Sequence, residues 1–244
     1  MPGPRKQGKP SGWAPYWAPY ISFLLLVELS KRVPATFAAV FFVLRVIGPL
    51  GLFAYFLMRN AYPELRAARW GMGAIADVAV GLVGAALWIA PFLLFDSLRP
   101  SDPGFDPGQL GRGGEWFAQT LRAIGYVAVT PFVEELFVRS WLLRFADVVE
   151  TRKSFLSVPI GRFSWRSFVI VTVWFVVSHQ FWWEYPVMFA WTLLTMAWFY
   201  YRKHLAPLVL VHAVTNGAIF AFVLGFDRVF RDASGAPISL WFFL

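Results

Sequence analysis

The sequence predicts an all-α protein, a polytopic transmembrane helical bundle of about seven to eight spans. Of its 244 residues, 58% are hydrophobic, the mean hydropathy is +0.57, and the chain contains 26 Phe and 13 Trp. A soluble domain of this length does not carry so many apolar and aromatic side chains. The apolar residues also fall into runs of about 20, the length that an α-helix needs to cross a bilayer.

The net charge and the absence of cysteine exclude several kinds of partner and site. The net charge of +8 does not indicate nucleic-acid binding, because the basic residues lie between apolar runs and not along one polar face. We expect membrane lipid as a partner and no nucleic acid. Arg5, Lys6 and Lys9 precede the first apolar run without a small-residue cleavage site after it, which predicts an uncleaved first helix. Without cysteine the chain has no disulfide, thiolate nucleophile or Cys-ligated metal.

Seven apolar runs are candidate spans within a single integral membrane domain, residues 1–244. An N-terminal part, residues 12–98, contains three of them. A core, residues 115–226, contains the other four and the chemical motifs. The candidate spans cover about residues 14–29, 34–58, 71–95, 124–148, 167–182, 187–201 and 205–226.

The first two spans contain features typical of membrane helices. Residues 13–20 repeat Trp-Ala-Pro-Tyr, whose amphipathic rings suit the membrane interface. The second span contains Arg45 and a Gly-Pro-Leu-Gly sequence at residues 48–51. This combination predicts a kinked helix whose charge faces protein or snorkels to the interface.

The third span carries small residues at intervals of four. Gly73, Asp77, Gly81 and Ala85 share one helix face, which predicts close packing against another helix. We expect Asp77 to meet a partner across this seam, and Arg45 is the candidate.

The remaining segments predict loops and orientation. Residues 98–114, rich in Pro, Gly and Asp, predict an extramembrane loop. Residues 241–244 are expected to dip into the interface or to begin a partial eighth helix. The distribution of Lys and Arg predicts a cytoplasmic amino terminus in the plasma (inner) membrane.

One apolar run holds three ionisable groups, Glu134, Glu135 and Arg139. Each costs roughly 2.5 to 3.5 kcal/mol at bilayer depth on insertion scales, so the run is a candidate functional element. Glu135 and Arg139 are four apart on one helix face and are expected to pair. Glu134 points about 100° away, which leaves it available for chemistry.

Two further helices carry polar groups at the same spacing. Phe175 and His179 are four apart, so the ring is expected to buttress the imidazole. His212 and Asn216 present an imidazole and an amide donor on one face. Together with Glu134, these groups can meet at one depth in the membrane. A carboxylate base, imidazoles and an amide donor predict a site that activates water and stabilises the oxyanion of an attacked amide.

These three motifs resemble, in order and on separate helices, the EExxxR, FxxxH and HxxxN motifs of the CPBP family. That family includes the type II CAAX prenyl endopeptidases and bacteriocin-processing enzymes and is regarded as a family of glutamic intramembrane proteases. The resemblance covers about residues 124–226. The first three spans add only a general likeness to members associated with exosortase systems, and no prenyl specificity is carried over.

The resemblance implies a hydrolase that uses water to cut a peptide bond in the membrane. Glu134 would be the general base, His179 would position the water, His212 would complete the polar site, and Asn216 would stabilise the oxyanion. The expected partner is a peptide or protein substrate with a membrane-proximal cleavage site, and no cofactor is expected. The structural or orienting residues would be Glu135, Arg139 and Phe175.

Two alternatives stay open from the sequence. Glu134, His179 and His212 offer a carboxylate and two imidazoles, a plausible zinc set, although no His-Glu-xx-His helix is present. A non-catalytic membrane scaffold, immunity or transport protein would instead use the same polar cluster to bind without cleaving.

Overall fold

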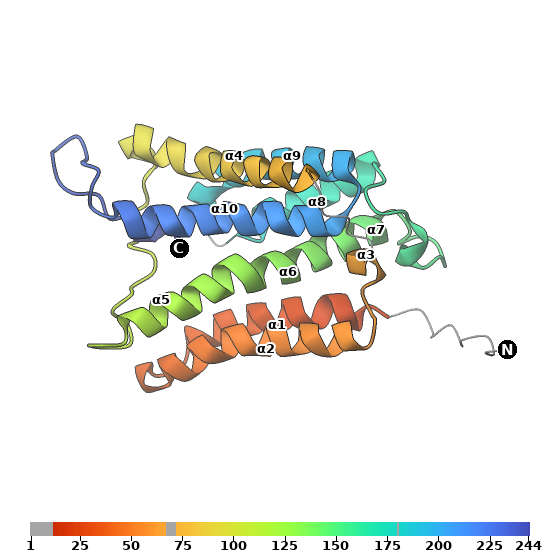
Figure 1. The fold of residues 1–244 in the computed structure, drawn as a ribbon, viewed down its shortest axis with the longest axis horizontal. Coiled ribbons are helices and arrows are strands. Elements are labelled where there is room, and N and C mark those ends of the chain that lie inside the picture. Colours follow the sequence, from red (N-terminus) through yellow and green to blue (C-terminus); the bar gives the residue numbers. More distant parts are fainter. Residues whose placement is uncertain (1–11, 67–71, 180) are drawn as a thin grey trace.

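A computed structural model describes residues 12–66, 72–179 and 181–244, and it is helical throughout the predicted bundle (Figure 1). Arg5, Lys6 and Lys9 lie outside these residues. Within the described ranges, three helices are long and apolar enough to cross a membrane: α2 (Ala38–Met58), α4 (Gly73–Leu94) and α10 (Leu205–Phe226). The chain is therefore an integral multi-pass membrane protein, and the larger number of spans stays a prediction.

Helices also occupy the other predicted spans. They are α1 (Ala14–Ser30), α8 (Trp165–Val177) and α9 (Tyr185–Arg202), and α3 (Pro63–Arg66) forms one turn between α2 and α4. The predicted fourth span lies in a continuous helix over residues 115–146, here called the central helix. In it, wider π-helical turns alternate with α-helix: α5 (Glu115–Ala123), Ile124–Val129, α6 (Thr130–Glu135), Leu136–Leu142 and α7 (Leu143–Ala146). Such π-helical turns are frequent at functional sites.

The central helix runs between two groups of helices (Figure 1). The antiparallel pair α1 and α2 covers one side of it, and α10, itself packed along α4, covers another. Helices α8 and α9 pack against each other, and α8 also contacts α7. This arrangement places the glutamates of the central helix beside polar groups from several other helices.

The small-residue face of α4 is a close-packing seam, as predicted. A Cβ atom added at Gly81 would lie 2.7 Å from Cβ of Val214 on α10. The hydroxyl of Thr215 also donates to the carbonyl oxygen of Gly81 over 3.0 Å. The missing side chain of Gly81 therefore lets the two backbones approach closely.

The predicted pairing of Asp77 with Arg45 is wrong. Asp77 is fully buried, forms an ion pair with Arg202 at 3.0 Å, and accepts a hydrogen bond from Nε1 of Trp198 at 2.8 Å. Both partners lie on α9, because the small-residue face of α4 faces α9 and α10. Arg45 lies on α2, across the central helix.

The tandem repeat of α1 is partly in the core and not wholly at the periphery. Tyr16 and Tyr20 are buried, and the ring of Tyr20 stacks on Phe137 with centroids 4.2 Å apart. Trp13 stays half-exposed and packs edge-on against Trp141 of the central helix. The four-residue spacing of the tyrosines places both rings on the face of α1 that meets the central helix.

The carboxyl-terminal tail folds back onto the bundle. Trp241–Phe243 form one 3-10 turn and not an eighth helix, and the rings of Phe242 and Phe243 lie 5.9 and 5.7 Å from that of Phe92. The backbone of the loop at Gly104 packs closely against this turn. A Cβ there would lie 2.3 Å from the Trp241 carbonyl oxygen, and the φ of +73° independently favours glycine.

A buried ion pair ties the α2–α4 connection to the central helix. Glu64 of α3 and Arg144 of α7 lie 3.2 Å apart, and both side chains are almost inaccessible. The hydroxyl of Ser140 donates to Glu64, and Tyr16 donates to the other carboxylate oxygen over 3.3 Å. The carboxylate is thus satisfied only because all these elements meet.

We predict that Arg144→Gln lowers the stability of the folded protein by roughly 3 kcal/mol or more, because it leaves the carboxylate of Glu64 buried without its counter-charge. The matched control is Arg166→Gln, which breaks an exposed 2.8 Å pair with Glu150. Exposed pairs contribute about 0 to 1 kcal/mol. Thermal unfolding in detergent micelles measures both variants, and equal shifts of the midpoint would contradict the structural role of the buried pair.

Candidate active site

The residues predicted to be catalytic come together from three parts of the fold. Glu134 lies on α6, His179 lies just after α8, and His212 and Asn216 lie one turn apart on α10. All four line one cavity of about 360 Å³. The predicted fifth span includes His179, but α8 ends at Val177, so the imidazole projects from the turn that follows the helix.

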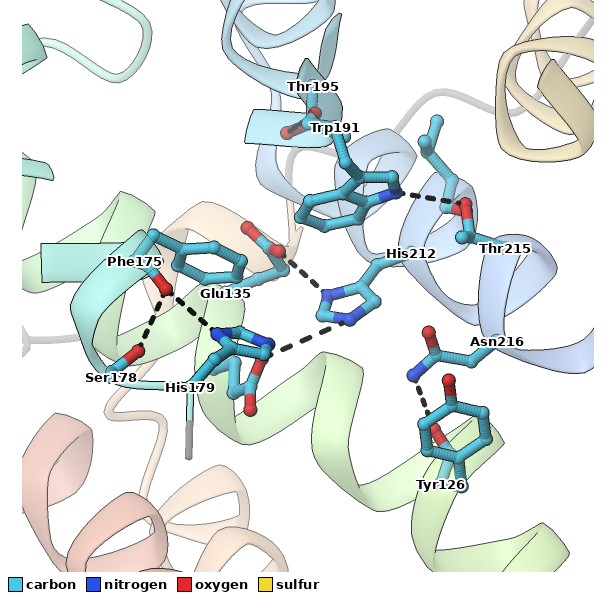
Figure 2. A network of polar contacts seen from close by, with 12 residues as sticks. Tyr126, Glu135, Phe175, Ser178, His179, Trp191, Thr195, His212, Thr215 and Asn216 are labelled. Atoms are coloured by element: carbon cyan, nitrogen blue, oxygen red, sulfur yellow. Dashed lines mark hydrogen bonds and ion pairs between the residues drawn. The ribbon is translucent and has the colours of Figure 1, made fainter. Parts of the chain in front are cut away.

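His212 lies between the two adjacent glutamates. Its Nδ1 is 2.9 Å from Oε1 of Glu135 (Figure 2), and its Nε2 is 3.9 Å from Oε2 of Glu134. An ionised carboxylate only accepts hydrogen bonds, so Nδ1 carries the proton and Nε2 of the neutral ring presents its lone pair on the side of Glu134. The side chain of Glu134 is 17% exposed and that of Glu135 is fully buried. Glu134 is therefore the carboxylate that the cavity reaches.

Arg139 compensates the buried charge of Glu135, as the four-residue spacing predicts. Its Nε lies 3.5 Å from Oε2 of Glu135, and both side chains are fully buried. A second nitrogen donates to Thr195 of α9 over 3.2 Å. The guanidinium also lies 4.0 Å from the ring centroid of Phe175, a cation–π contact. Arg139 is thus fixed on three sides and holds Glu135 in place.

Phe175 orients His179 through its backbone as well as its ring. The Phe175 carbonyl oxygen is 2.9 Å from Nδ1 of His179 (Figure 2), and the ring centroids lie 5.8 Å apart. A carbonyl only accepts, so Nδ1 donates and Nε2 is left unprotonated in the neutral ring. The ring of Phe175 meanwhile stacks on Trp191 at 5.5 Å. The predicted buttressing is present, with the carbonyl as its polar part.

Asn216 is held by an unusual feature of the central helix. Its side-chain nitrogen donates to the carbonyl oxygen of Tyr126 over 2.7 Å (Figure 2). In an α-helix that carbonyl would accept from the N–H of Thr130, which here bonds to Gly125 one residue further back. The next position is Pro131, which has no N–H. The carbonyl of Tyr126 is therefore left for Asn216, whose second N–H and oxygen remain for other partners.

Three site residues are not among those predicted. Tyr126 supplies the carbonyl just described, Thr195 binds Arg139, and the ring of Trp191 lies 4.8 Å from that of His212 at a steep angle. Trp191 and Thr195 are four apart in an apolar helix, the same spacing that marks the other motifs. For Tyr126 the available signal is Pro131, five residues downstream.

No metal cage forms among these groups. Within residues 12–66, 72–179 and 181–244, no three His, Asp or Glu side chains are placed so that they could hold a metal ion together. A tetrahedral zinc site would require such ligands within about 2.0–2.2 Å of one point. Nδ1 of His212 binds Glu135, so only Nε2 of this ring is directed at the cavity.

Comparison with known protein families gives a match over the central part of the fold. Residues 116–218 match the family described as type II CAAX prenyl endopeptidase Rce1-like. The matched range contains the central helix from its second residue, α8, α9 and the part of α10 that holds His212 and Asn216. No curated protein and no solved structure matches the chain. Over residues 116–218 the chain is therefore similar to the Rce1-like type II CAAX prenyl endopeptidase (CPBP) family.

Proposed function

We propose that this protein is an intramembrane glutamic endopeptidase in which Glu134 activates a water molecule to cut a membrane-proximal peptide bond. The family of the matched domain implies an intramembrane protease and hence a peptide substrate. The observation that carries the proposal is the placement of His212, bound to buried Glu135 on one side and facing the accessible Glu134 on the other.

The chemistry follows from which group can take a proton. Glu134 accepts a proton from water as the oxygen attacks the carbonyl carbon of the substrate. The tetrahedral oxyanion then collapses, the C–N bond breaks, and Glu134 returns the proton to the leaving amine. Protons and charge balance, since the water supplies the hydroxyl of one product and a hydrogen of the other.

The other polar groups have separate roles in this scheme. His179 and His212 each keep one ring nitrogen unprotonated when neutral, and these nitrogens accept hydrogen bonds that position the water. The separation of 3.9 Å between His212 and Glu134 is too long for a direct hydrogen bond and leaves a water-bridged one as the alternative. Asn216 uses one N–H on Tyr126 and offers the other to the oxyanion. Glu135, Arg139 and Phe175 are positioning residues.

Two alternatives use the same cluster. In the zinc alternative, Glu134, His179 and His212 would hold the metal, and zinc would supply Lewis-acid activation of the water. In the other, the protein is a scaffold, immunity or transport protein that binds without cleaving. The neutral donors and acceptors directed at one cavity favour hydrolysis, since simple binding does not call for a carboxylate next to an imidazole.

The proposal extends to the biological setting. We infer a cytoplasmic amino terminus in the plasma (inner) membrane, from the distribution of basic residues. We also propose membership of the exosortase-associated subset, which rests on the general likeness of the first three spans alone. Membrane lipid would surround the bundle and a membrane-proximal peptide segment would enter the cavity.

We expect Glu134→Gln to abolish cleavage and leave the fold intact, because the amide keeps the shape but cannot take a proton. General-base catalysis contributes roughly 10²- to 10⁴-fold to rate. The measurement compares peptides that accumulate in cells bearing wild-type or variant protein, with Glu150→Gln, an exposed glutamate, as the matched control. An unchanged peptide profile for Glu134→Gln would favour the non-catalytic alternative.

Chelation separates the general-base proposal from the zinc alternative. Cleavage of the peptide identified in this way should persist after treatment with a strong chelator, and the purified protein should carry no stoichiometric metal. A loss of activity that zinc restores would support the alternative, in which the metal supplies the activated water.

Glu135→Gln and His212→Gln should affect kcat non-additively, because His212 is oriented by its hydrogen bond to Glu135. We expect roughly tenfold or greater loss for each single variant and little further loss in the double variant. Asp77→Asn combined with His212→Gln is the control cycle, since Asp77 pairs instead with α9. Additive effects in the first cycle would argue against a functional link through the 2.9 Å bond.

A further inference from the structure

The cavity that contains Glu134 has a basic end. Arg45 of α2 and Arg122 of α5 both line it. Across the described part of the chain, neither guanidinium has a carboxylate within 4.0 Å. Nε of Arg122 is buried and has no hydrogen-bond partner. The two arginines thus differ from Arg139 and Arg144, which are each paired with a glutamate.

Aromatic rings orient these arginines without neutralising them. The guanidinium of Arg45 lies 5.4 Å from the ring centroid of Phe42, and that of Arg122 lies 5.6 Å from Phe105 and 5.4 Å from Tyr126. The rings of Phe42 and Phe105 lie 6.0 Å apart, so the two like charges are brought near each other. Unpaired charges in a partly enclosed, apolar setting are unfavourable, and an anion between them would relieve both their repulsion and their desolvation.

The acidic residues of the cavity do not fill this role. Asp102 lines it but accepts a hydrogen bond from the backbone N–H of Gly104 at 2.8 Å, which stabilises its own turn. Glu184 also lines it, from the turn before α9, and forms no ion pair with either arginine. Neither of these acidic side chains therefore neutralises the basic end of the cavity.

We infer that Arg45 and Arg122 bind a carboxylate of the peptide substrate, either its C-terminal carboxylate or that of an Asp or Glu side chain. This inference rests on the proposed function. Arginine suits such a site because its planar guanidinium binds carboxylates through two parallel hydrogen bonds. A lipid phosphate is less well matched, because the cavity that the two arginines line continues to Glu134.

The spacing sets where the carboxylate lies in the substrate. Arg122 and Glu134 are twelve residues apart on the central helix. At the α-helical rise of about 1.5 Å per residue their backbones would be about 18 Å apart, and the wider π-helical turns over residues 124–129 shorten this distance. An extended peptide advances about 3.4 Å per residue, so at most about five residues separate the scissile bond from the bound carboxylate. The preferred substrate thus carries its negative charge within about five residues of the cut.

The experiment measures cleavage of capped peptides by the wild-type protein in phosphatidylcholine nanodiscs, with products read by mass spectrometry. The peptides end in a free acid or an amide, and further amides carry a single Asp at successive positions. We expect kcat/KM to be roughly tenfold higher for peptides with a carboxylate at the matching distance, mainly through KM. Arg45→Gln and Arg122→Gln should reduce this acid-to-amide ratio towards one, and Arg122→Lys should keep part of it. Arg112→Gln, an exposed arginine of the preceding loop, should retain it fully.

Equal kcat/KM for acids and amides, or a ratio unchanged in both glutamine variants, would overturn the inference. If no peptide is cut, the proposed protease function fails by itself, and the anion site is tested by thermal unfolding of Glu134→Gln protein with the same peptides. A midpoint raised by acids more than by amides, and only when Arg45 and Arg122 are present, supports the site. A rise that phosphatidylglycerol produces and peptide acids do not would assign the arginines to lipid and overturn the proposal.

Discussion

Burial of the Glu135 carboxylate is the constraint on which the other parts of the site depend. The side chain is fully removed from solvent, so its charge needs partners within the protein. Arg139 supplies the counter-charge from the same helix and His212 supplies a hydrogen bond from α10. Arg139 in turn needs Thr195 from α9 and the ring of Phe175 from α8. One buried charge thereby fixes α8, α9 and α10 around the central helix. The accessible Glu134, which is next to Glu135 in the chain, is held in position by the same contacts.

The parts of the site that sequence could predict are those that helical periodicity decides. Glu135 and Arg139 pair because residues four apart share a face, and the same rule places His212 beside Asn216. The bond between Glu135 and His212 joins residues 77 positions apart, and no local pattern shows which way two helices turn towards each other. The interpretation of Asp77 failed for this reason, since the choice between partners on α2 and α9 depends on how the helices pack.

Fold prediction followed the same division between local and distant information. Apolar runs located most helices within a few residues, because bilayer-crossing length and hydropathy are local properties, but the central helix begins at Glu115 and not at the predicted residue 124. The end of α8 before His179, the burial of Tyr16 and Tyr20, and the turn at Trp241–Phe243 depend on neighbours that lie elsewhere in the chain. The amphipathic Trp and Tyr rings of residues 13–20 suit both the membrane interface and the protein core, and only the packing of the helices decides which of the two they occupy.

The missing N–H of Pro131 has a mechanical consequence for the bundle. It leaves the carbonyl oxygen of Tyr126 in the central helix without a backbone donor, and the side chain of Asn216 on α10 donates to this oxygen instead. One turn away on the same helix, His212 holds Glu135. These two contacts hold α10 against the central helix. A slide of α10 by one turn, about 5.4 Å, would break both contacts at once, so the two helices keep a single register beside the cavity.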